Sequence, residues 1–120
     1  MAKILSVDDS QVIREMITTI LTEQGHEVKT AKDGVEAFRM TAKEEFDLIF
    51  CDINMPNMNG ISFVSRVRRL DKYANVPIIM LTTESQKEKK DQAKTMGATG
   101  WLLKPFTRER ILNAISKFVA

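Results

Sequence analysis

The sequence predicts one α/β domain, with a doubly wound sheet of five parallel strands and helices on both faces, a (βα)5 arrangement. Three observations predict it. The chain has 120 residues, the size of one domain, and 43% of them are hydrophobic, which is enough for a packed core. Segments with helical periodicity separate five short apolar runs, which recur at fairly even intervals. The runs lack strict alternation, as is typical of parallel strands covered on both faces: Ile4–Val7, Val28–Ala31, Leu48–Cys51, Ile78–Leu81 and Trp101–Leu103.

The first two helices are predicted to follow the first two runs. Apolar residues after the first run lie at helical spacing and form one stripe: Val12, Ile13, Met16, Ile17, Ile20 and Leu21. Gly25 follows and suits the left-handed backbone that ends a helix. After the second run, Asp33 precedes a helical pattern and has Glu36 three residues further on, which is a helix-start signal.

The later elements carry similar signals. Val76 precedes Pro77 and is therefore biased towards extended backbone, which marks the entry to the fourth run. Ser85–Glu88 fits a capping box, and Gly97 is predicted to end the helix that begins there. Thr107 can cap the last helix, whose apolar side consists of Ile111, Leu112, Ile115, Phe118 and Val119.

Composition excludes several classes of protein. The single cysteine, Cys51, rules out an internal disulfide and a multi-cysteine metal site, and it is expected in the core. No apolar run is long enough for a signal peptide or a membrane span, so a cytoplasmic protein is expected. The chain lacks G-x-x-x-x-G-K-[ST] and G-x-G-x-x-G motifs, which argues against P-loop hydrolysis and dinucleotide binding. The lone histidine, His26, is expected in a surface turn.

Charge is divided unevenly along the chain. Residues 1–60 have a net charge of −5 and residues 61–120 a net charge of +7, which suggests an acidic site built early and a basic face built late. We expect Arg66, Arg68 and Arg69 to be exposed to solvent rather than to bind nucleic acid. The lysine-rich segment Ser85–Met96 is either a docking face for an acidic partner or simply a solubilising surface.

Polar side chains follow four of the five runs. Asp8 and Asp9 follow the first run, Asp52 the third, Thr82 the fourth and Lys104 the fifth. Because the carboxyl ends of parallel strands lie along one edge of a sheet, we expect these groups to converge there. Helix capping could explain some of them singly, but it does not explain the whole set.

The chemistry of this set indicates a metal ion and a phosphoryl group. Clustered carboxylates repel one another unless a cation is present, and their hard oxygens favour Mg²⁺ or Mn²⁺ over zinc. Such a metal accepts phosphate oxygens as further ligands, Lys104 can pair with phosphate, and Thr82 offers a hydroxyl donor. Asp52 is the best candidate for a nucleophile that forms an aspartyl phosphate, because its strand should be central and its flanks are apolar.

Four motifs in order along the chain resemble the signatures of two-component response-regulator receiver domains: Val7–Ser10, Leu48–Gly60, Leu81–Glu84 and Lys104–Thr107. The similarity covers the whole chain, and the segment Asn54–Gly60 is most similar to stand-alone chemotaxis members. The resemblance implies a flavodoxin-like (βα)5 receiver domain over residues 1–120, without an effector domain. It also implies a signalling protein rather than an enzyme, one that catalyses only its own phosphorylation and dephosphorylation.

The resemblance further implies a metal site and a phosphodonor. Asp52 would take a phosphoryl group from a phosphohistidine on a partner histidine kinase. Asp9 and Asp52 would hold Mg²⁺ directly, joined by the backbone carbonyl of Asn54, while Asp8 would act largely through water.

Other residues match family positions around the phosphoryl group. Lys104 would contact that group, and Thr82 would move to hydrogen-bond it. Asn54 and Glu84 match positions that tune how fast the family loses its phosphate. The Lys104–Pro105 peptide bond would be cis.

The resemblance also predicts where the signal leaves the domain. The surface formed by Ser85–Met96, the strand over residues 100–103 and the last helix binds the flagellar motor switch in chemotaxis members. Trp101 occupies a position where those members commonly have tyrosine or phenylalanine coupled to Thr82, so it either rotates inward on activation or is a static, half-buried packing residue. We expect a monomer that binds neither nucleic acid nor a membrane. A phosphatase is a further possible partner of this domain.

Two other functions share this chemistry. A small metal-dependent phosphatase of the haloacid dehalogenase kind also forms an aspartyl phosphate, but it places a second aspartate where this chain has Asn54, and it usually has a longer chain. A phosphate sink or relay intermediate in another two-component pathway would use the same residues, and the sequence does not separate it from a motor effector.

Overall fold

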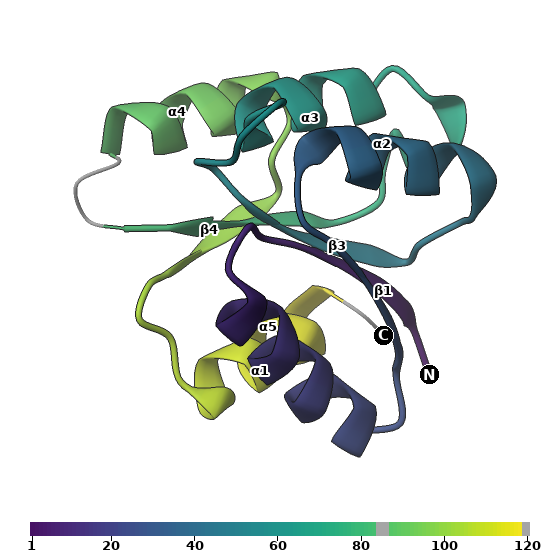
Figure 1. The fold of residues 1–120 in the computed structure, drawn as a ribbon, viewed down its shortest axis with the longest axis vertical. Helices are drawn as coiled ribbons and strands as arrows, with labels where there is room; N and C mark the ends of the chain where they lie inside the picture. Colours follow the sequence, from purple (N-terminus) through teal and green to yellow (C-terminus); the bar gives the residue numbers. More distant parts are fainter. Residues whose placement is uncertain (84–86, 119–120) are drawn as a thin grey trace.

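The computed structural model describes residues 1–83 and 87–118, and in this part of the chain strands and helices alternate as predicted. The elements are β1 Lys3–Val7, α1 Gln11–Glu23, β2 Glu27–Ala31, α2 Gly34–Lys43, β3 Leu48–Asp52, α3 Gly60–Val67, a 3₁₀ turn at Asp71–Tyr73, β4 Ile78–Thr82, α4 Lys87–Met96, β5 Gly100–Leu103 and α5 Arg108–Phe118. The strands form one parallel sheet in the order β2-β1-β3-β4-β5. Figure 1 shows α1 and α5 on one face of the sheet and α2, α3 and α4 on the other. The predicted fold class is therefore confirmed.

The central strands are buried on both faces, which explains why their sequences are apolar without alternation. In β3, Leu48 and Phe50 pack with the core residues of α1 and α5. Their neighbours Ile49 and Cys51 pack with those of α2, α3 and α4. Burial and the nearby negative charges of Asp52 and Asp8 raise the pKa of the Cys51 thiol well above its ordinary value. Cys51 is therefore a protonated core residue, as expected.

Helix ends lie close to where capping chemistry predicts them. Asp33 accepts a hydrogen bond from the Glu36 backbone N–H at 2.8 Å, and the Thr107 hydroxyl accepts one from the Arg110 N–H at 3.2 Å. Gly25 and Gly97 have φ angles of 87° and 118°, which only glycine adopts without strain. The predicted cap at Ser85 lies outside the described residues, as does Val119.

The predicted stripe of α1 is wrong at its first residue. Ile17, Ile20 and Leu21 are buried, whereas the side chain of Val12 is 72% exposed. Val12 lies in the first turn of α1, where none of the described elements covers it. His26 follows the turn as expected, but it is half-buried, and its Nδ1 accepts a hydrogen bond from the Ala2 N–H at 3.0 Å.

Arg68 is not a solvent-exposed member of a basic cluster, which corrects the sequence-based expectation. Its side chain is half-buried and donates hydrogen bonds to the carbonyl oxygens of Tyr73 and Val76, each at 2.6 Å, and of Gly97 at 3.0 Å. It also donates to the Thr99 hydroxyl at 3.2 Å. These carbonyls lie at the ends of elements or in the connections between them, and the fork of guanidinium donors satisfies several of them at once. Arg68 therefore links the end of α3 to the segments that lead into β4 and into β5.

Candidate functional site

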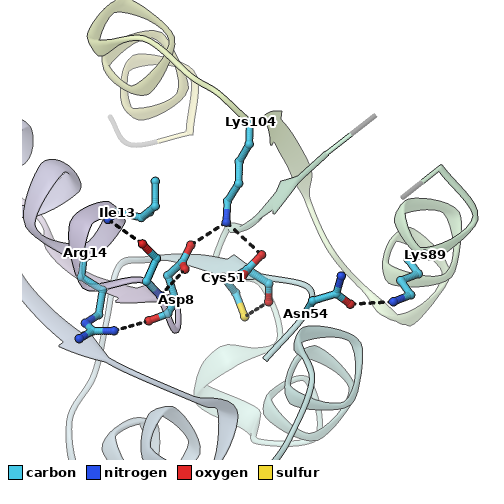
Figure 2. Close-up of polar contacts among 9 residues, drawn as sticks. Asp8, Ile13, Arg14, Cys51, Asn54, Lys89 and Lys104 are labelled. Carbon is cyan, nitrogen blue, oxygen red and sulfur yellow. Dashed lines mark hydrogen bonds and ion pairs between the residues drawn. The ribbon is translucent and has the colours of Figure 1, made fainter. Parts of the chain in front are cut away.

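The polar residues after the strands meet at the carboxyl edge of the sheet, as predicted. Strand order places β3 between β1 and β4, with β5 beyond β4. Asp8 and Asp9 follow β1, Asp52 and Thr82 are the last residues of β3 and β4, and Lys104 follows β5. Residues up to 96 positions apart in the sequence thus form one site (Figure 2).

Lys104 bridges two of the carboxylates. Its Nζ lies 3.0 Å from Asp8 Oδ2 and 3.3 Å from Asp52 Oδ1. The backbone N–H of Lys104 also donates to the Thr82 carbonyl at 2.6 Å, which fixes the start of the chain that leaves β5. The Lys104–Pro105 peptide bond is cis, as the resemblance implied.

The carboxylates are close enough together to share one cation. One oxygen from each of Asp8, Asp9 and Asp52 lies within 4.8 Å of the others. Asp8 is fully buried, and its Oδ1 accepts a hydrogen bond from the Ser10 N–H at 2.9 Å, whereas Asp9 is exposed. A cluster of hard oxygens that includes one exposed carboxylate fits Mg²⁺ or Mn²⁺, because these ions take one or two carboxylates and keep several waters.

The local electrostatics make Asp52 an unusual carboxyl group. Burial and the negative charge of Asp8 raise the pKa of Asp52 to about 6, although Lys104 opposes the shift. Burial alone would lower the pKa of Lys104, but its pairing with Asp8 and Asp52 outweighs that effect and raises it. The ionised form of Asp52 is therefore destabilised near neutral pH, and a further cation beside it would stabilise that form.

We predict that Asp52 in the metal-free protein titrates near pH 6, since above that pH the carboxylate must ionise beside Asp8. Replacing Asp8 with asparagine removes the negative neighbour, so the midpoint should move down towards the ordinary range of aspartate. Carboxyl ¹³C chemical shifts followed across pH 3 to 8 would measure both midpoints. A wild-type midpoint near 4 would contradict the electrostatic argument.

Thr82 is buried, and its Oγ1 has no hydrogen-bond partner among the described residues. A buried hydroxyl without a hydrogen-bond partner lowers the stability of the folded state unless a ligand or water binds to it. Asp52 pairs in register with Leu81, so Thr82 lies one residue further along the neighbouring strand. Its position and its free hydroxyl fit a donor to an oxygen of a group held on Asp52.

Asn54 lies on the loop after β3 and contacts α4. Its side chain is exposed, and its Oδ1 accepts a hydrogen bond from Lys89 Nζ at 2.6 Å (Figure 2). The use of its backbone carbonyl as a metal ligand stays a prediction, and Glu84 lies outside the described residues. Sequence reasoning missed Lys89, because a lysine in a lysine-rich helix gives no signal of its partner.

Gly60 packs directly against the backbone that carries Asp52. Its N–H donates to the Ile53 carbonyl at 2.8 Å, and a Cβ here would collide with the carbonyl oxygen of Asp52. We predict that Gly60→Ala costs about 2 kcal/mol of folding free energy, because the backbone that carries Asp52 must shift. Denaturant unfolding would measure this loss. The control is Gly100→Ala, whose added methyl meets only ordinary contact with Phe118, and equal losses in the two variants would contradict the steric argument.

Comparisons with known proteins agree with this geometry. The family model described as "Response regulator receiver domain" matches residues 4–116. The chain belongs to the response-regulator receiver family. It is 43% identical over 107 residues to "Chemotaxis protein CheY homolog" of Campylobacter jejuni, a match that covers 88% of this chain and 82% of that protein. The structure of chemotaxis response regulator CheY4 of Vibrio cholerae superimposes with a TM-score of 0.94, at 49% identity and over 99% of both chains.

Not all relatives are of similar length. The receiver domain is 34% identical over 116 residues to "Probable transcriptional regulator ycf29" of Porphyra purpurea, and it spans 56% of that protein's length. Receiver domains take phosphoryl groups from histidine kinases and are generally signalling proteins rather than enzymes. None of the described helices is long and apolar enough to cross a bilayer.

On the flank of this receiver domain, Trp101 points outward. Its side chain is 40% exposed, and Lys90 Nζ of α4 lies 4.2 Å from the centre of its ring, in a cation–π contact. Trp101 also lines a groove of about 520 Å³ formed by α4, β5 and α5, together with basic residues that include Lys94, Arg110 and Lys117. In this structure Trp101 is therefore a surface residue, neither turned inward nor deeply packed.

Proposed function

We propose that this receiver domain accepts a phosphoryl group on Asp52 from a histidine kinase in a reaction that requires Mg²⁺, and that phosphorylation changes its affinity for a flagellar motor switch protein in the cytoplasm. The observation that carries the proposal is the cluster at the carboxyl edge of the sheet. There the carboxyl group of Asp52, whose pKa is raised, lies beside two further carboxylates and the ammonium of Lys104.

The transfer needs an in-line attack at phosphorus. An oxygen of ionised Asp52 forms a bond to phosphorus, the bond from phosphorus to the kinase imidazole breaks, and its electron pair stays on the imidazole nitrogen. Lys104, which already contacts Asp52, offsets the charge of the transferred group, and the Thr82 hydroxyl donates to one of its oxygens. Asp9, Asp52 and the Asn54 carbonyl would hold Mg²⁺, and Asp8 would act through water. The bound ion would supply further compensation of negative charge.

The docking surface proposed for the switch protein is the groove between α4, β5 and α5. Its walls combine apolar surface from Trp101 and Phe118 with positive charge from Lys94, Arg110 and Lys117. This combination suits an amphipathic segment that carries acidic residues. Because Trp101 belongs to the groove and Lys90 holds its ring, a change at α4 would alter the groove directly.

Intact-mass spectrometry with a small acyl-phosphate donor tests the first half of the proposal. We expect one phosphoryl group per chain with Mg²⁺ and almost none when a chelator replaces it. Labelling that is independent of divalent ions would contradict the proposed metal requirement. Steady turnover of assorted phosphomonoesters would instead favour the phosphatase alternative.

Capture by the flagellar motor switch protein of the same organism tests the second half. We expect the phosphorylated domain to bind more tightly than the unmodified one, and the binding to weaken as salt rises, since the groove is basic. Efficient phosphorylation without any switch binding would favour the phosphate-sink or relay alternative.

A further inference from the structure

Lys89 connects α4 to the loop that carries Asn54, a contact that spans 35 residues of sequence. The charged ammonium of Lys89 donates to the neutral amide oxygen of Asn54, and the two atoms lie 2.6 Å apart. Figure 2 shows the ammonium of Lys89 facing the amide oxygen of Asn54, on the side of the loop away from Asp8. Two other lysines of α4 make different contacts: Lys90 covers the Trp101 ring, and Lys94 borders the groove.

Asn54 is placed to influence a second reaction, the loss of the phosphoryl group to water. In that step a water oxygen forms a bond to phosphorus, and the bond from phosphorus to the Asp52 oxygen breaks. The electron pair returns to the carboxylate, and the water proton leaves with inorganic phosphate or solvent. Asn54 follows Asp52 by two residues, and its side chain is exposed to solvent. A carboxamide oxygen there is an acceptor that can orient the attacking water.

We propose that Lys89 is a positioning residue that binds the amide oxygen of Asn54, withholds it from the attacking water and so prolongs the phosphorylated state. The inference rests on the proposed function, since it concerns a phosphoryl group on Asp52. It assigns to α4 a chemical role in the timing of the signal, in addition to its place in the docking groove. Phosphorylation itself and metal binding do not require Lys89.

The test measures how long the label survives. The full chain and its variants are phosphorylated with an acyl-phosphate donor, freed of donor by rapid desalting, and followed by intact mass in saturating Mg²⁺. We expect Lys89→Ala to lose phosphate about threefold faster than wild type or more, which is a small change in activation free energy. Lys89→Arg keeps a cationic donor and should restore most of the lifetime. Lys43→Ala, which removes an exposed lysine from the end of α2, should match wild type.

A double-mutant cycle separates positioning from a general charge effect. In an Asn54→Ala background, Lys89→Ala should have no further effect, because the group that Lys89 positions is absent. Unchanged or slower phosphate loss in Lys89→Ala, or equal acceleration in both backgrounds, overturns the inference. A wild-type chain that cannot be labelled at all would instead contradict the proposed function, and the inference with it. The initial rate of labelling and the Mg²⁺ dissociation constant should be the same for Lys89→Ala as for wild type.

Discussion

Replacing Asp52 with asparagine should abolish labelling by an acyl-phosphate donor and at the same time make the unmodified domain more stable at neutral pH. Labelling is lost because the carboxamide is a poor nucleophile. Stability rises because the pKa of Asp52 is about 6 in the folded chain, against an ordinary value of 3.8. Above pH 6 the folded state therefore carries the full cost of an ionised Asp52 that is buried and lies beside Asp8, and asparagine avoids this cost.

The expected gain from Asp52→Asn is on the order of 2 kcal/mol at pH 7 without metal. This gain in stability should shrink as the pH falls from 6 towards 3.8, because Asp52 in the folded wild type is then protonated and, like asparagine, carries no charge. Urea unfolding at several pH values, with and without Mg²⁺, measures this dependence. Labelling that persists in Asp52→Asn would show that another residue accepts the phosphoryl group, and a loss of stability would contradict the electrostatic argument.

Replacing Lys104 with methionine should have the opposite effect on stability. The side chain of Asp8 is fully buried and pairs with Lys104, whose side chain is 21% exposed, so removing the ammonium leaves a buried carboxylate without its cation. We expect a loss of about 2 kcal/mol at pH 7, below the range for fully buried pairs because Lys104 still meets solvent. Labelling should also slow strongly, because the charge that offsets the phosphoryl oxygens is gone.

Magnesium distinguishes this charge effect from lost packing. The Lys104→Met variant should still bind Mg²⁺, and a saturating concentration should recover much of its lost stability, because the ion replaces the missing positive charge. The matched control is Lys3→Met, which breaks the pair between Lys3 and Glu44, whose side chains are both partly exposed, and should change little. A Lys104→Met variant that labels at the wild-type rate would remove this lysine from the mechanism.

The convergence of Asp8, Asp52 and Lys104 was predictable because it depends only on topology. Residues that follow parallel strands must lie along one edge, and apolar runs locate the strand ends to within a residue. The sequence did not reveal how far each group would be buried. Asp8 is fully buried while its neighbour Asp9 is exposed, a difference set by the path of the loop into α1.

Contacts made by long, flexible side chains were not predictable. Arg68 and Lys89 belong to basic segments that composition alone describes as solvated, yet each has definite partners in the fold. Their partners depend on how α3 and α4 are rotated and tilted on the sheet, which a pattern of apolar residues sets only coarsely. Trp101 is a related case, because its exposed ring contacts Lys90 of a neighbouring helix.

Arg68 has a consequence for how α4 can move. Its guanidinium fixes Gly97 and Thr99, at the end of α4 that is remote from Asp52, while Lys89 contacts Asn54 near the opposite end. We therefore expect α4, when it moves, to pivot about its C-terminal end at Gly97. A displacement of α4 beside the phosphoryl group would therefore be largest at its N-terminal end, which carries Lys89. It would also change the contact between Lys90 and the ring of Trp101.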